Sequence, residues 1–205
     1  MHTQKRTKLT NTTMAKTKRQ KSIDAQEEKD RYIAIRCMEQ TTDLQEKQRL
    51  RAVPTDVKSH IDLICVIQDW YANPIKWYDI EIKERNKSYE NVQKYPYAEL
   101  KVDKYNNMLK DKGPNSDLLY IVLLNQKLAL IFNLSTLDWT QVQRTTWNIK
   151  EIQYEDGSEK KDTEVYLIPY TLAEKLVPCE EYYTEYENYI NTIQSTQKKT
   201  NRQHR

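Results

Sequence analysis

Residues 60–67, HIDLICVI, and residues 77–86, WYDIEIKERN, decide the fold that the sequence predicts. Both stretches are rich in apolar and β-branched residues, and Asn73-Pro74 between them supplies the turn of an antiparallel hairpin. Alternation in the second strand, expected over Lys76–Lys83, puts Ile80 and Ile82 on one face. Asp79, Glu81 and Lys83 then share the other face. The hairpin therefore carries core on one side and charge on the other.

The charged face has the residue types needed for metal-dependent phosphodiester chemistry. Such chemistry uses a divalent cation, a positioned water and a cationic side chain that steadies the developing charge. Asp62, Glu81 and the main-chain carbonyl of Ile82 supply hard oxygen ligands of the kind that Mg²⁺ prefers. Lys83, two residues after Glu81, is expected to face the water and phosphate. The pairing of the two strands predicts that these residues converge.

The Glu-x-Lys spacing by itself has little specificity in a chain so rich in both residues. Glu27-Glu28-Lys29 and Glu159-Lys160-Lys161 also match it. The first lies at a helix start and the second in a charged loop, so only Glu81-Ile82-Lys83 comes from an apolar strand. The alternative for this triplet is the solvated face of an edge strand with a cross-strand ion pair.

Hydrophobic spacing predicts further helices and strands on both sides of the hairpin, and therefore an α/β domain with a central mixed sheet flanked by helices. A helix from Ser22 or Asp24 to about Met38 is expected first, and polar residues 41–58 follow as a helical extension and a connection. A second helix is expected over Ala98–Lys112, a strand pair over Leu118–Leu124 and Leu128–Leu134, a short strand over Glu164–Tyr170, and a final helix from about Thr171.

Composition predicts one domain, residues 23–193, between a basic arm, 1–22, and a polar basic tail, 194–205. No acidic residue precedes Asp24. The two ends are expected to be attracted to polyphosphate, or else to be solvated and disordered. The three cysteines show no metal-binding spacing, which favours a reducing compartment. No apolar signal core or membrane span is evident, so a soluble, cytoplasmic protein is expected.

The order of these elements resembles that of the PD-(D/E)XK nuclease superfamily, particularly its small phage and mobile-element members. HIDLICVI resembles the Asp-bearing strand of that family, WYDIEIKERN the Glu-x-Lys strand, and AELKVDKYNNML, residues 98–109, the following helix with its inward lysine. Ile61 stands where the family name has proline. The resemblance implies that Asp62 and Glu81 hold Mg²⁺ or Mn²⁺ and that Lys83 orients water or stabilises charge. It also implies Glu28, or its neighbour Glu27, as a first-helix acid and Lys104 as a lysine near the site.

The resulting hypothesis is a Mg²⁺-dependent nuclease that hydrolyses DNA with a metal-activated water, acting in the host-cell cytoplasm if it is phage-encoded. DNA is the expected partner, and cutting both strands predicts a homodimer or a phage or replication protein as partner. One alternative is a catalytically inactive nucleic-acid-binding or virion-associated module on the same fold. Another is an assembly protein whose Tyr-rich C-terminal helix, with Trp139 and Trp147, forms a protein interface.

Overall fold

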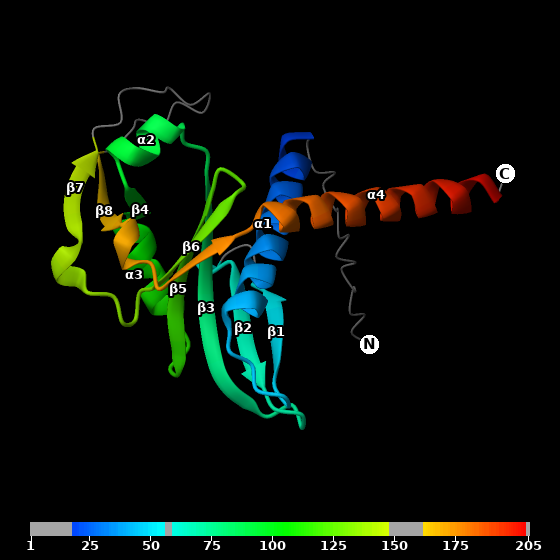
Figure 1. Cartoon of the computed structure of the whole chain (residues 1–205), viewed down its shortest axis with the longest axis horizontal. Helices are drawn as coiled ribbons and strands as arrows, with labels where there is room; N and C mark the ends of the chain where they lie inside the picture. The colour runs from blue at the N-terminus through cyan, green and yellow to red at the C-terminus, as the bar shows by residue number, and fades with distance from the viewer. Residues whose placement is uncertain (1–17, 56–58, 148–161, 204–205) are drawn as a thin grey trace, which may run out of the picture.

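A computed structural model describes residues 18–55, 59–147 and 162–203 (Figure 1). Residues 1–17 of the predicted basic arm and most of the charged loop predicted over 153–162 lie outside the described residues. The predicted domain boundaries stay predictions. Helix α4 (Glu180–Gln203) does, however, run through most of the stretch expected to be a tail. No helix in the described part of the chain combines the length and apolarity needed to cross a membrane.

Among the described residues, six strands form a mixed sheet in the spatial order β1-β2-β3-β5-β6-β9. Their bounds are Arg49–Pro54, Leu63–Gln68, Pro74–Arg85, Ser116–Leu124, Leu128–Asn133 and Lys175–Pro178. β3 and β5 are parallel, and each other neighbouring pair is antiparallel. The predicted fold class, a central mixed sheet flanked by helices, is confirmed.

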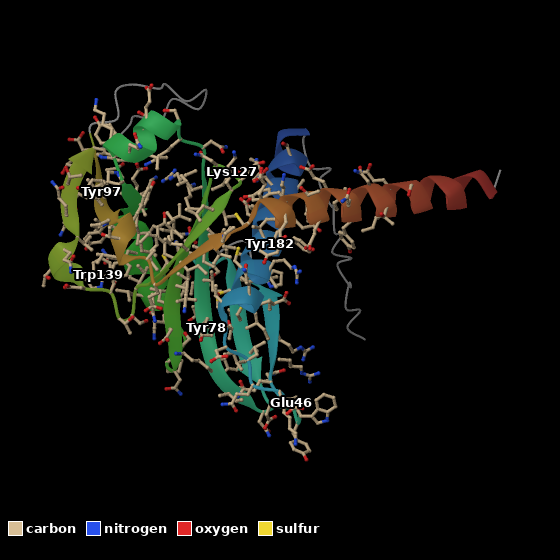
Figure 2. The ribbon with its side chains drawn as sticks, viewed as in Figure 1. Glu46, Tyr78, Tyr97, Lys127, Trp139 and Tyr182 are labelled. Carbon is tan, nitrogen blue, oxygen red and sulfur yellow. The ribbon has the colours of Figure 1, made fainter. Side chains whose placement is uncertain are left out.

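Helix α1 (Lys18–Thr41) covers one face of this sheet, and α4 crosses α1 and extends away from the sheet (Figure 1). The buried stripe of α1 consists of Ile33, Ala34, Cys37 and Met38, which pack against Ile80 and Ile82 of β3 among others. These positions recur every three to four residues, as one face of a helix requires. The Tyr182 hydroxyl of α4, labelled in Figure 2, donates to Gln40 Oε1 over 2.7 Å.

The opposite face packs on a second sheet and on α3 (Val102–Asp111). In this described part, β4 (Tyr97–Lys101), β8 (Thr163–Pro169) and β7 (Gln143–Trp147) pair antiparallel in that order. Helix α2 (Tyr89–Lys94) lies next to them (Figure 1). Tyr120 and Phe132 fill the core between the two sheets.

Three sequence-based assignments were wrong, the first and third of them because they depended on partners distant in the chain. The helix predicted from Ala98 begins only at Val102, since Ala98 and Leu100 alternate as buried residues of β4 and pair with β8. Residues 49–54, expected within a connection, form β1 against β2. The helix predicted from Thr171 begins at Glu180, because residues 175–178 pair with β6 as β9.

Asp79, predicted on the charged face, is a buried structural carboxylate. It is 4% exposed and accepts hydrogen bonds from the Gly113 amide, at 2.7 Å, and from the Ser116 hydroxyl. These bonds hold the turn between α3 and β5. A Cβ at Gly113 would lie 3.3 Å from Ser116 Oγ and 3.6 Å from Asp79 Oδ2, so glycine suits this close approach.

Replacing Asp79 by alanine is expected to lower the free energy of unfolding by about 2–3 kcal/mol, because two donors lose their acceptor in a buried turn. Urea denaturation followed by circular dichroism measures this change. Asp69→Ala is the comparison, since Asp69 also accepts a backbone amide, from Asn73 at 2.8 Å, but in an exposed turn. Equal stability of the two variants would contradict the structural role of Asp79.

Candidate functional site at the free edge of strand β3

The site lies where β2 begins, because β3 continues past the first residue of β2 and has no neighbouring strand on that side among the described residues. Leu63, the first residue of β2, pairs with Ile80. The Asp62 amide still donates to the Ile80 carbonyl at 2.9 Å. Two residues further along β3, the Ile82 amide donates to Asp62 Oδ2 at 2.8 Å, where a neighbouring strand would otherwise supply a main-chain acceptor. One hydrogen bond therefore fixes the Asp62 carboxylate beside the Glu-x-Lys segment.

A cavity of about 370 Å³ opens at this edge, between β3 and α1. Its lining is dominated by acids and their polar neighbours, namely Gln26, Glu27, Asp30, Arg31, Asp62, Glu81, Ile82, Lys83 and Glu84. Asp62, Glu81, Ile82 and Lys83, four of the residues expected from sequence, thus border one cavity. The convergence predicted from strand pairing is present.

Glu81 is the most deeply buried acid of the cavity, at 7% exposure. Burial, followed by the Asp62 charge, raises the pKa of its carboxyl group to about 8, against the opposing effect of Lys104. Lys104 Nζ, on α3, lies 2.8 Å from Glu81 Oε2. Apart from this ammonium, that oxygen has no hydrogen-bond donor among the described residues. Glu81 thus keeps acceptor capacity free inside the protein.

The two lysines expected at the site occupy different environments. Lys83 is exposed at the border of the cavity, and its ammonium forms no ion pair with a described residue. Lys104 is 28% exposed and is paired with Glu81. Lys83 is therefore available to a ligand, whereas Lys104 already balances part of the charge of the site.

The first-helix acid at the cavity is Asp30, and Glu28 lies elsewhere. Glu28 borders a separate cavity between α1 and α4, together with Tyr186. Glu27 reaches the first cavity but is exposed and paired with Arg31, whose Nη2 lies 3.4 Å from Glu27 Oε2. Asp30 is one turn before the buried Ala34, so it shares the face of α1 that packs on the sheet.

The spacing of the buried α1 residues Ile33, Ala34, Cys37 and Met38 was the signal that could have identified Asp30 from sequence. The helical phase chosen in its place was that of Tyr32, Ile35 and Met38, with Glu28 one turn before Tyr32, and of these three apolar residues only Met38 is buried. The Asp30 pKa is raised to about 6. Burial is the largest cause and the charges of Glu84 and Asp62 add to it, while the hydrogen bond from Gln26 Nε2 at 2.8 Å and the Lys29 charge oppose the rise. Gln26 Nε2 also donates to Glu84 Oε2 at 3.1 Å, which orders these side chains at the cavity wall.

The donor set fits a hydrated hard cation better than an all-protein metal cage. In the described part of the chain, no three His, Cys, Asp or Glu side chains are arranged to hold a metal ion. Two carboxylates and a main-chain carbonyl would leave several positions to water, as Mg²⁺ prefers. A divalent cation would also compensate the repulsion between Asp62 and Glu81 that raises the Glu81 pKa.

The fold and cavity together define an α/β protein with a carboxylate-and-lysine site on the part of β3 that extends beyond its pairing with β2. No protein-family model matches the chain, and no curated protein matches it. A solved structure that does match is Hjc of Archaeoglobus fulgidus, a Holliday junction resolvase. The two are 13% identical, the match covers 64% of this chain and 87% of that chain, and the TM-score is 0.35. A likeness of this size carries no weight for function.

Proposed function

We propose that this protein is a divalent-metal-dependent nuclease that hydrolyses phosphodiester bonds of DNA. The observation that carries the proposal is the Ile82 amide holding the Asp62 carboxylate beside the buried Glu81, with Lys83 exposed at the cavity border and in no ion pair with a described residue. Two carboxylates, a main-chain carbonyl and an exposed cation at one cavity are the parts that metal-assisted phosphodiester hydrolysis needs.

Asp62, Glu81 and the carbonyl of Ile82 are the groups that would hold Mg²⁺ or Mn²⁺. When bound, the cation supplies Lewis-acid polarisation of the phosphate and lowers the pKa of a water molecule. Lys83 would steady charge on the phosphate, because its ammonium is exposed and has no partner among the described residues. Lys104 would act through Glu81, since its charge lowers the pKa of that carboxyl group.

Removing the metal is expected to abolish cleavage of labelled single- and double-stranded DNA, and either Mg²⁺ or Mn²⁺ should restore it. Asp62→Asn should lower the rate at saturating metal by about 10³-fold, a loss typical of removing a group that stabilises transition-state charge. Asp69→Asn is the matched control, because Asp69 accepts the Asn73 amide at 2.8 Å in the turn at the far end of the same two strands.

Circular dichroism must show that both variants are folded. Cleavage that persists in EDTA, or that survives in folded Asp62→Asn, would contradict the proposal. Salt-dependent DNA binding without cleavage under any metal would instead favour the inactive nucleic-acid-binding module.

A further inference from the structure

A second cavity, of about 490 Å³, lies on the outer face of the three-stranded sheet, next to α2. Its walls are mostly apolar and aromatic and include Tyr95, Tyr97, Trp147 and Leu167. Tyr95 is 53% exposed and Trp147 38% exposed. Figure 2 shows Tyr97 on this sheet, on the side of the molecule away from α4. Flat aromatic groups that remain exposed around a cavity are suited to stacking on a planar ligand.

Alternate residues of β3 connect this aromatic cavity to the carboxylate site. Glu81, Lys83 and Arg85 share one face of the strand by period two, and Lys87 lies two residues beyond the end of the strand. The five residues from Glu81 to Arg85 span four steps, or about 13 Å of strand, which is the length of a few stacked nucleotides at about 3.4 Å each. Lys87 lines the aromatic cavity itself.

The charge along this path is suited to a phosphate backbone. Arg85 Nη2 lies 3.4 Å from Glu99 Oε2, and Lys87 Nζ lies 2.9 Å from Glu99 Oε1. One carboxylate therefore faces two cations, and Lys83 adds a third cation with no partner among the described residues. Glu99 and Lys87 are 17% and 16% exposed, so the pair also fixes the polar wall of the aromatic cavity.

From this juxtaposition we infer that the aromatic cavity binds an unpaired base of a nucleic-acid strand whose backbone follows Lys83, Arg85 and Lys87 to the carboxylate site. The inference rests on the proposed function and extends it, because it assigns the enzyme a substrate with a single-stranded or unpaired segment beside the phosphate that is cut. Trp147 and Tyr97 would stack on the base.

The test is the affinity of full-length protein for labelled single strands of roughly eight nucleotides, within the usual site size of such proteins. Fluorescence anisotropy in EDTA measures binding without cleavage. Trp147→Ala should weaken binding about tenfold to a hundredfold, as expected for loss of one stacking contact, and Trp147→Phe should retain most of the affinity. Trp147→Ala should lose affinity both for a DNA strand and for an RNA strand of the same sequence, because both strands present bases for stacking.

Trp70→Ala is the matched control, since Trp70 is 76% exposed in the β2–β3 turn and borders neither cavity. It should bind as the wild type does, and so should Trp147→Ala when the ligand is a blunt duplex. Wild-type affinity of folded Trp147→Ala for single strands would overturn the inference and leave a protein contact as the use of these aromatics.

The two proposals fail in different ways. If Trp147-dependent binding is found but no metal supports cleavage, the base-binding inference holds and the nuclease proposal fails. If cleavage requires metal and Asp62 but Trp147→Ala binds single strands normally, the nuclease proposal holds and this inference fails.

Discussion

Glu81→Gln is expected to lose at least about 10³-fold in cleavage rate and at the same time to be more stable than the wild type above neutral pH. The loss of activity follows because an amide is a poorer ligand than a carboxylate for a hard cation. The gain in stability follows because burial and the Asp62 charge raise the Glu81 pKa, so its ionised form is unfavourable in the folded protein.

The sign of the pH dependence follows from the two pKa values. The ordinary glutamate value is 4.5 and the folded value is about 8. Glu81 is protonated in both states at low pH, and its ionisation then favours the unfolded chain as the pH rises between these values. The stability that the protonated Glu81 carboxyl group supplies is therefore fully present below pH 4.5, and it is lost as the pH rises through about 8.

Urea denaturation in EDTA, at about pH 4 and about pH 9, measures this difference. Glu81→Gln should match the wild type at the lower pH and exceed its free energy of unfolding at the higher pH by about 2–4 kcal/mol. Added Mg²⁺ should stabilise the wild type by mass action and leave Glu81→Gln unchanged. A variant with the pH slope of the wild type, or with wild-type cleavage, would contradict this assignment.

Lys83→Ala and Lys104→Met are expected to impair cleavage in different ways. Lys83 is exposed and has no partner among the described residues, so its removal should lower the rate at saturating metal by about 10²–10³-fold with little change in stability. Lys104 lowers the pKa of Glu81. Its removal should raise that pKa further, so that more metal is needed at neutral pH, by about tenfold for one pKa unit.

Cleavage rates measured against metal concentration at two pH values separate these effects. The metal midpoint of Lys104→Met should recover as the pH rises, while the low rate of Lys83→Ala should persist at every metal concentration. Lys101→Ala is the control, because Lys101 is an exposed lysine that borders neither cavity. Identical profiles for Lys83→Ala and Lys104→Met would contradict the separate roles.

Local pattern was sufficient for the hairpin and for part of the site. Apolar alternation predicted β2 and β3 as an antiparallel pair, and this pairing brings Asp62 to Ile82 across 20 positions of sequence. Local pattern was also sufficient to predict the turn between β5 and β6, where Asn125 and Gln126 adopt positive φ values of 54° and 57°. Asparagine tolerates this conformation better than most residues.

The same alternation was misleading for Asp79. It correctly separated Asp79 and Glu81 from the apolar face of β3, but it could not tell a structural carboxylate from one that borders a cavity. The difference depends on what approaches each residue. The Gly113 turn reaches Asp79, whereas β2 begins only at Leu63, opposite Ile80, and so leaves β3 unpaired on that side beside Glu81.

The sequence by itself determined the α/β class, the hairpin and the convergence of Asp62, Glu81, Ile82 and Lys83, because these depend on period-two alternation and on strands close together in the chain. Only the tertiary structure decided that Asp30 faces the cavity in place of Glu28, that Lys104 pairs with Glu81, and that residues 97–101 and 175–178 are strands. These features depend on partners far away in sequence, whose packing selects the helix phase and overrides local spacing.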